Sequence, residues 1–380
     1  MKQFSVQQNE AGQRLDKLLA KILNKAPKSF IYKMLRKKNI TLNGKKADGS
    51  EKLAIQDEIK LFLSDETIEQ FSEIADTTVV EAKLDVLYED KHILIINKPL
   101  GILSQKAQKE DVSIVEYIIS YMLSTKQIAK EQLVSFKPSI CNRLDRNTSG
   151  ILIAGKSLLG LQEMARLLKD RSLNKYYLCI VKGKVEEKKR IEGFLSKDEE
   201  KNQVKIFAKQ SENTEYICTE YEPIAYSRTA LKDHSTLHEE ALQRQLKKKT
   251  VLSDTVSSNT MKVSKNSTFL KDTLEMEETE DTSGSYTLLQ VKLITGRSHQ
   301  IRAHLASIGH PLIGDFKYGN QRTNHYFKNK YGLSHQLLHS YRMVFPKIDG
   351  ELSYLSDKEF VAEVPELFRL IKNDLFSKNN

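Results

Sequence analysis

The apolar residues near the N-terminus recur with the spacing of two short amphipathic helices. The first helix has apolar positions at i, i+3, i+4 and i+7, namely Leu15, Leu18, Leu19, Ile22 and Leu23. The second helix, which Ser29 can cap, buries Phe30, Ile31, Met34 and Leu35. The alternating residues 40–42 and the Asn43-Gly44 turn then predict a β-hairpin. This pattern predicts a small helical-hairpin (αα-hairpin) domain over residues 1–65.

From Leu84 onward the chain shows mostly strand patterns with an occasional helix. Strand patterns cover 85–90, 92–99, 151–154 and 175–183, and one helix pattern covers 158–168. The turns between these segments are short, and later strands recur with hairpin spacing. The sequence therefore predicts an α+β fold, in which residues 81–370 surround a mixed, largely antiparallel central sheet.

Two polar segments interrupt these patterns. Residues 66–80 are polar and acidic, which predicts a linker. No proline or glycine lies between Pro223 and Gly284, and residues 250–285 are crowded with Ser, Thr, Lys and Glu. We interpret about 231–285 as a solvated insertion that is mobile after residue 250. The flanks Tyr216–Thr229 and Tyr286–Leu293 are expected to form adjacent strands.

The charge of the chain favours a polyanionic partner. The 60 Lys and Arg residues outnumber the 50 Asp and Glu residues, which gives a net charge of +10 and a pI near 9.1. Residues 1–65 hold fourteen Lys and Arg against seven Asp and Glu, a local net charge of +7. A solvated helix face is the simpler alternative, but so large an excess favours a phosphate-binding surface.

Cysteine usage and hydropathy bear on where the protein works. The three cysteines, Cys141, Cys179 and Cys218, show neither a disulfide framework nor paired metal spacing, which favours a reducing cytosol. The N-terminus has no apolar signal region, and no apolar run approaches the ~18 residues that span a bilayer. We expect a cytoplasmic monomer without a membrane partner.

Two dense segments carry the candidate chemistry. Residues 142–150 place Asp145 between Arg143 and Arg146, in a turn that opens onto an apolar strand. Residues 295–305 supply further cations that could close over the same carboxylate. Taken alone, Asp145 would more simply cap its own turn.

These two segments resemble the signature motifs of the RluA family of RNA pseudouridine synthases. Asn97-Lys98-Pro99 with Gly101 is similar to the first catalytic strand of that family, and its third motif extends through residues 308–319. Arg14-Leu15-Asp16 in the basic helical hairpin resembles the S4 domain, which precedes the catalytic domain in RluC- and RluD-like members. A generic basic hairpin is the alternative for that region.

The resemblance implies a reaction and a set of roles. A pseudouridine synthase cuts the N1–C1′ bond of a uridine in RNA, turns the base and rejoins it through C5. Asp145 would be the catalytic carboxylate, as nucleophile or as base, with Arg297 as its fixed cation. Arg143 would fill the space that the flipped uridine leaves, Tyr177 would stack on the uracil, and Leu293 would wall the pocket.

The resemblance also implies the partner. RNA would bind the S4-like region, most directly through Arg14, Lys33, Arg36, Lys37 and Lys38. The S4-like front end favours ribosomal RNA of the large subunit (23S), or a ribosomal assembly intermediate, over tRNA. The isomerisation needs no cofactor, and we expect no metal.

The chain departs from the family pattern at three places. Many relatives carry His where this chain has Asn142 and Asp where it has Asn147. An amide at position 142 cannot titrate, so an imidazole there is not essential if the enzyme is active. The joint at 231–285 is normally short.

Rival interpretations explain less of the sequence. Gly150 to Ser157 satisfies the Walker A expression, but an apolar strand fills the supposed phosphate loop. His299 and His304 are five residues apart, which does not fit a zinc pair on one helical face. A non-catalytic S4-type RNA-binding protein would explain the basic front end and leave Asp145 without a role.

Overall fold

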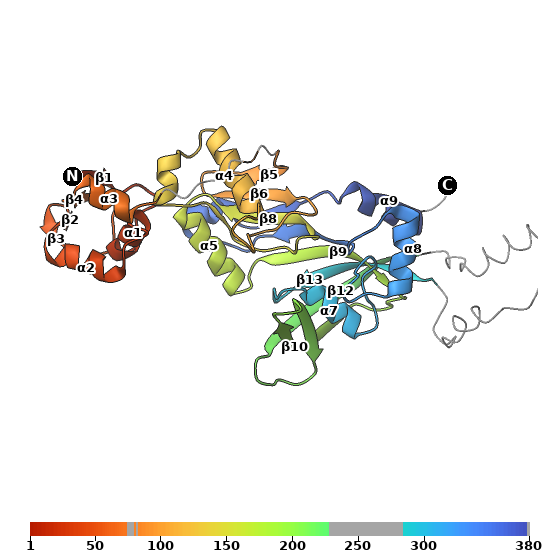
Figure 1. Cartoon of the computed structure of the whole chain (residues 1–380). Helices are drawn as coiled ribbons and strands as arrows, with labels where there is room; N and C mark the ends of the chain where they lie inside the picture. The colour runs from red at the N-terminus through yellow and green to blue at the C-terminus, as the bar shows by residue number, and fades with distance from the viewer. Residues whose placement is uncertain (74–79, 81–82, 228–283, 378–380) are drawn as a thin grey trace, which may run out of the picture.

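The structure is a computed structural model that describes residues 1–73, 80, 83–227 and 284–377. The described residues form a small N-terminal domain with its own sheet and a larger domain around a second sheet (Figure 1). This arrangement confirms the predicted α+β class. The expected insertion at 231–285 lies outside the described residues, apart from its last two positions.

The N-terminal domain packs two helices against an antiparallel sheet. Helices α1 (Leu15–Ile22) and α2 (Lys28–Arg36) cover a core that includes Leu18 and Leu35, both fully buried. The four strands, in the order β1-β4-β2-β3, are β1 (Lys2–Ser5), β2 (Ile40–Leu42), β3 (Lys45–Lys46) and β4 (Glu58–Leu61). The β2–β3 turn has positive φ at Asn43 (52°) and Gly44 (71°), which confirms the predicted hairpin.

Two details of this domain differ from the sequence prediction. Ser29 does not cap α2: the helix begins at Lys28 with Pro27 at the N-cap position, so Ser29 lies in the first turn. The expected linker 66–80 begins with a helix, α3 (Asp65–Phe71), whose N-cap Ser64 accepts a hydrogen bond from the Thr67 amide. The polar composition hid an apolar pair on this helix, Ile68 and Phe71, that packs on the domain core.

The second sheet organises the larger domain and follows the order β11-β10-β12-β13-β9-β14-β8-β6-β5, with β7 beside β8 and β15 beside β14. Its pairs are antiparallel, except that β14 runs parallel to β8. The strands are β5 (Val86–Glu89), β6 (Ile93–Lys98), β7 (Ser139–Ile140), β8 (Ser149–Gly155), β9 (Asn174–Lys182), β10 (Lys189–Asp198), β11 (Gln203–Phe207), β12 (Glu215–Tyr226), β13 (Tyr286–Leu293), β14 (Leu338–Val344) and β15 (Glu359–Val361). Strands β12 and β13 pair directly, which confirms the prediction made from the flanks of the insertion.

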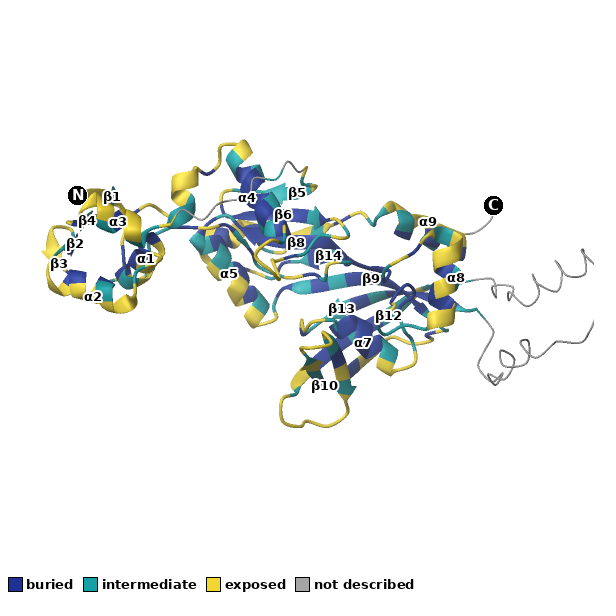
Figure 2. Ribbon diagram, in the orientation of Figure 1, coloured by how far each residue is buried: buried dark blue, intermediate teal, exposed yellow. Residues whose placement is uncertain are grey.

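Apolar layers cover both faces of the centre of this sheet. Along β6, Leu94 and Ile96 join one apolar cluster with α4 residues, whereas Ile93 and Ile95 join another with α5 residues. This double burial explains the continuous apolar runs in β6 and β8 (Figure 2). The helices are α4 (Ile114–Ser124), α5 (Leu158–Lys169), α7 (Gln300–Ser307), α8 (Gln321–Tyr331) and α9 (Glu366–Phe376), with 3₁₀ turns at Lys130–Val134 and Gly350–Leu355.

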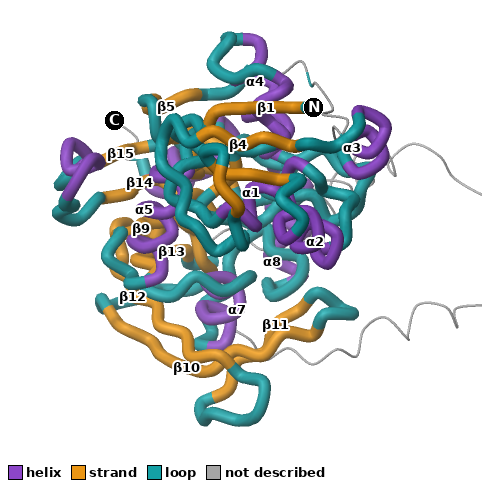
Figure 3. Tube along the Cα trace, turned by 90° about the vertical axis from the view of Figure 1, so that its left-hand side faces the viewer, coloured by secondary structure: helices purple, strands orange, loops and turns teal. Residues whose placement is uncertain are grey.

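Two parts of this fold bear on the candidate chemistry. Residues 150–155, the first six positions of the Walker A match, lie in the buried strand β8 and form no phosphate loop. Helix α7 lies against β11 and β12 (Figure 3). It thereby carries the second cation-rich segment to the same side of the sheet as Tyr177, because Ile301 and Tyr177 belong to one apolar cluster.

Candidate active site

Residues from distant parts of the chain line one cavity of about 580 Å³. It lies where the 143–148 loop, strand β9, the end of β13 and the start of α7 meet. All five residues to which the family resemblance gave a role at the site line it, namely Arg143, Asp145, Tyr177, Leu293 and Arg297. The fold therefore brings the two motif segments together at a hollow of a size that holds a small ligand or a nucleotide.

The loop that carries Asp145 is fixed on both sides of that residue. Ser104 Oγ accepts a hydrogen bond from the Leu144 amide (3.0 Å) and donates to the Leu144 carbonyl (2.7 Å). Lys98 Nζ donates to the carbonyl of Arg146 at 3.2 Å. The backbone on either side of Asp145 is therefore held before any substrate binds.

Lys98 is itself an unusual anchor, because it is fully buried at the end of β6. Its ammonium group donates a second hydrogen bond, to the carbonyl of Pro99 at 2.8 Å. Burial lowers the pKa of Lys98 to about 8, although the Asp145 carboxylate opposes that shift. Sequence reasoning noted Lys98 as part of a motif but missed this role; a lysine that ends an apolar strand was the available signal.

Gly150 lets the strand that follows this loop approach β14. Its φ is +108°, and a Cβ atom there would lie 2.1 Å from the Ser340 carbonyl oxygen. No residue with a side chain fits that spacing without moving β8 or β14.

Arg302, the third residue of α7, holds the Asp145 carboxylate. Its Nη1 lies 3.0 Å from Asp145 Oδ2, while Nε and Nη2 donate to the two carboxylate oxygens of Asp315 at 2.7 and 2.9 Å. Burial opposes ionisation of Asp315, but these hydrogen bonds to Arg302 hold the pKa of that carboxyl below its usual value. One guanidinium thus joins two carboxylates in a geometry that an ammonium group cannot reproduce.

The expected pair between Asp145 and Arg297 is not formed. Arg297 lines the cavity, but its Nη1 lies 2.8 Å from Glu215 Oε1 and its side chain is 44% exposed. Arg297 lies in the turn before α7, whereas Arg302 lies in the first turn of the helix and is 8% exposed. The family motif predicted Arg297 as the partner of Asp145, but in the structure the buried Arg302 contacts the Asp145 carboxylate.

His299 approaches Asp145 from the start of α7. Its Nε2 lies 3.9 Å from Asp145 Oδ2, and its Nδ1 lies 2.9 Å from the Tyr318 hydroxyl, which also accepts a hydrogen bond from the Val204 amide. Burial lowers the pKa of His299, and the Arg302 guanidinium adds to that effect, against the pull of Asp145. Its φ of 54° is uncommon for a residue with a side chain.

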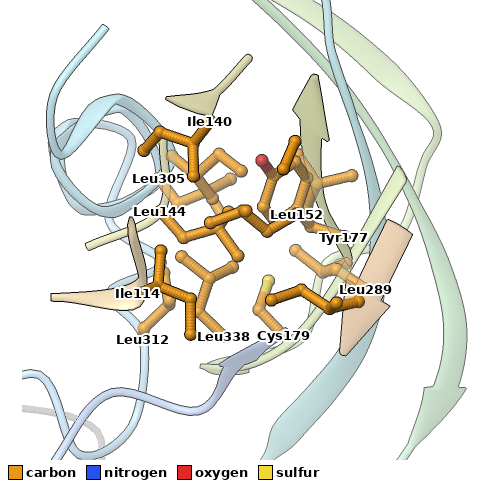
Figure 4. Close-up of a cluster of buried hydrophobic side chains, with 14 of the residues drawn as sticks. Ile114, Ile140, Leu144, Leu152, Tyr177, Cys179, Leu289, Leu305, Leu312 and Leu338 are labelled. Carbon is orange, nitrogen blue, oxygen red and sulfur yellow. The ribbon is translucent and has the colours of Figure 1, made fainter. Parts of the chain in front are cut away.

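Tyr177 belongs both to the apolar core and to the cavity wall. It is 5% exposed and packs in one apolar cluster with Leu152, Cys179 and Leu289, as Figure 4 shows. Burial raises the pKa of its hydroxyl to about 12, so the side chain stays neutral. Leu293 lies at the edge of the same cluster and also lines the cavity.

Arg143 and Asn142 are neighbours with different surroundings. Arg143 is exposed at the cavity and pairs with no acidic group among the described residues. Asn142 Oδ1 accepts a hydrogen bond from the Ile153 amide (2.8 Å), and its Nδ2 donates to the Ile151 carbonyl (3.4 Å). Asn142 thus binds the backbone of β8 through two hydrogen bonds. An amide can make both bonds without a change of protonation.

Asn147 and His339 also have different surroundings, one at the cavity and the other inside the fold. Asn147 lines the cavity. His339 is fully buried, with Nδ1 2.8 Å from Ser149 Oγ and Nε2 3.1 Å from the Ala362 carbonyl. It therefore ties β8 and β14 to the segment after β15. Burial lowers the pKa of His339 to about 4.

Four of the five cations expected to bind RNA lie free on the N-terminal domain. Lys33, Arg36, Lys37 and Lys38 are exposed at the C-terminal end of α2 and form no ion pair within the described chain. Arg14 differs, because its Nε lies 3.0 Å from Asp16 Oδ1. The Tyr32 hydroxyl also donates to Asp16, at 2.9 Å, so this corner of the domain is partly neutralised.

Within the ranges that the structure covers, no group of three or more His, Cys, Asp or Glu side chains is arranged to hold a metal ion. His304 Nδ1 instead lies 3.0 Å from Thr219 Oγ1. The helices of the described residues are all too short or too polar to cross a membrane.

Comparison with known proteins matches both parts of the chain. Residues 92–307 match the model of the RNA pseudouridylate synthase family, and residues 13–59 match the S4 domain. The chain is 27% identical to an uncharacterized RNA pseudouridine synthase of Mycoplasma genitalium, over 91% of this chain and 90% of the relative. It is also 27% identical to ribosomal large subunit pseudouridine synthase D of Borreliella burgdorferi, over 77% and 69%. Human RNA pseudouridylate synthase domain containing 4 covers 76% of this chain and 91% of its own, at 17% identity and a TM-score of 0.48.

The family model spans more than half of the chain and contains the Asp145 loop, β9 and α7. The S4 match covers both basic helices of the N-terminal domain. The chain therefore belongs to the RluA family of RNA pseudouridine synthases, and it is an isomerase with an RNA-binding S4 domain ahead of its catalytic domain.

Proposed function

We propose that this synthase isomerises uridines in large-subunit ribosomal RNA and that Asp145 is its catalytic carboxylate. The observation that carries the proposal is the position of Asp145, which lies at the cavity with Arg302 3.0 Å from its Oδ2 atom. The name of the Borreliella relative, a ribosomal large subunit synthase, supports the choice of RNA.

A single carboxylate suffices for the reaction. The N1–C1′ bond breaks, the uracil turns, and a C5–C1′ bond forms; C5 then loses its proton and N1 gains one. Glycoside hydrolysis needs a second carboxylate to activate water, but here the incoming nucleophile is the uracil that has just left. Asp145 serves either by attacking C1′ or by removing a proton from the ribose, and Arg302 fixes its direction in both cases.

The cavity walls suit a base that has left its stack. The buried ring of Tyr177 and the side chain of Leu293 offer an apolar surface for uracil, and aromatic stacking contributes roughly 1–3 kcal/mol per base. Arg143 is exposed at the same cavity, where its guanidinium can fill the gap in the RNA helix. Unpaired cations of the N-terminal domain add affinity for phosphates outside the cavity.

The test gives the protein two unmodified substrates, a transcript of 23S ribosomal RNA and a pool of tRNA transcripts. Pseudouridines are then mapped by carbodiimide treatment and primer extension, in buffer with EDTA and no added cofactor. We expect new stops at defined uridines of the 23S transcript and none in tRNA. Modification of tRNA alone would contradict the proposed substrate.

A further inference from the structure

Lys175 is a buried cation that plays no part in the chemistry described above. It lies on β9 two residues before Tyr177, and alternate residues of a strand face the same way, so both side chains face the cavity side of the sheet. Lys175 is 8% exposed. Across the described chain, its ammonium group has neither a hydrogen bond nor an ion pair.

Three other cations with largely buried side chains in the described part of this domain have protein partners. Lys98 donates to two carbonyl oxygens, Lys156 Nζ lies 2.6 Å from Glu89, and Arg302 contacts two aspartates. Partial desolvation of an ammonium group that has no protein partner costs free energy, because nothing replaces the water molecules that burial removes. An unpaired lysine at this position is therefore better explained by a partner that arrives with the substrate.

Lys175 does not itself line the cavity, but its ammonium group lies next to Gly296, which does. Its Nζ is 3.8 Å from the point where a Cβ atom on Gly296 would lie, and Gly296 lines the cavity. Gly296 has no side chain to cover it. Lys175 Nζ is also not among the fully enclosed polar atoms that lack a partner, so it still opens to solvent.

The surroundings of Lys175 favour an anion. Burial lowers the pKa of Lys175, and the nearby Arg171 guanidinium lowers it further, while no carboxylate of the described residues counters them. An anion that binds here would relieve both the burial cost and the repulsion between the two cations. It would gain a charge-assisted hydrogen bond in a partly desolvated site.

We propose that Lys175, beside Gly296, is a subsite for a phosphodiester group next to the target uridine in the RNA strand. Two residues along a strand span about 7 Å, which is the scale on which a nucleotide separates its base from a neighbouring phosphate. A uracil against Tyr177 thus leaves a flanking phosphate within reach of Lys175. This inference rests on the proposed function and adds to it a contact that positions the substrate strand.

The test compares Lys175→Met, Lys175→Gln and Lys175→Arg in the full-length protein. Lys292→Met serves as the matched control, because Lys292 pairs in register with Tyr176 and so lies on the opposite face of the sheet. Affinity for the 23S ribosomal RNA transcript is measured over a range of KCl concentrations, and melting temperature is measured alongside.

We expect Lys175→Met and Lys175→Gln to bind about tenfold more weakly, with a salt slope shallower by about 0.7–0.9, the contribution of one phosphate contact. Their melting temperatures should stay the same or rise, because an unpaired buried charge is removed. Lys175→Arg should keep the salt slope, and the control should bind like the parent.

Unchanged affinity and slope in Lys175→Met and Lys175→Gln would overturn the subsite. A lowered melting temperature in both variants would also overturn it, because Lys175 would then support the fold. Failure of the parent to modify the 23S transcript would contradict the proposed substrate, and the binding comparison would still decide the role of Lys175.

Discussion

Arg302 donates from Nη1 to Oδ2 of Asp145 at 3.0 Å, although 157 residues separate the two in the chain. The same guanidinium also donates hydrogen bonds to both carboxylate oxygens of Asp315. Asp315 is 1% exposed, so this support belongs to the core of the domain. The Asp145 carboxylate is thus oriented by contacts that exist before substrate binds.

Arg302→Lys should lower turnover by about 100-fold or more while leaving RNA affinity nearly unchanged. A lysine cannot contact Asp145 and both oxygens of Asp315 together, and a small misplacement of a catalytic group has effects of that size. Single-turnover pseudouridine formation measures the loss. Arg190→Lys, which alters an exposed arginine paired with Glu192, is the control. A larger loss in Arg297→Lys than in Arg302→Lys would contradict the assignment.

Tyr177→Phe should bind RNA nearly as well as the parent, because it keeps the ring face and loses only the hydroxyl. Tyr177→Ala should bind more weakly, by roughly 1–3 kcal/mol if stacking on the base is its role. Binding isotherms and thermal melts of both variants separate the possibilities. Equal large losses of melting temperature would instead mark Tyr177 as a core residue only.

The exposed cations after α2 should govern much of the salt dependence of RNA binding. Replacing Lys33, Arg36, Lys37 and Lys38 by Gln should weaken binding and flatten its dependence on KCl, by about 0.9 in slope for each duplex phosphate that is no longer bound. Arg14→Gln should change the slope less, because Asp16 already pairs with Arg14. An unchanged slope in the fourfold variant would show that RNA binds elsewhere.

Stability should fall as the pH drops from about 6.5 to about 4. Burial lowers the pKa of both His304 and His339 to about 4, so in this window the unfolded chain binds protons that the folded chain does not. Each histidine contributes at most about 3 kcal/mol to the loss. Urea unfolding at pH 7 and pH 5 should show a smaller difference for His339→Gln than for the parent. Equal differences would contradict this account.

The sequence predicted those elements whose signals are local. The apolar spacing of Leu15 to Ile22, the Asn43-Gly44 turn and the uninterrupted run in β8 each indicated their structure correctly. Helix α3 was missed because its apolar side is only two residues wide within a polar segment.

The candidate site was predictable only in part, for a physical reason. Motif resemblance indicated which segments meet, and the fold brings them to one cavity. The resemblance did not indicate which arginine contacts Asp145, because that depends on how α7 is rotated against β11 and β12. The exposed pair of Arg297 with Glu215 and the buried pair of Arg302 with Asp315 are long-range contacts that no local pattern carries.

Asp145→Asn is the most direct test of the central claim. The amide matches the carboxylate in shape but supplies no anionic oxygen, so pseudouridine formation on the 23S transcript should be abolished. Melting temperature and RNA affinity should stay close to those of the parent, which shows that the cavity is intact. Retained isomerisation by folded Asp145→Asn protein would contradict the claim that Asp145 carries the chemistry.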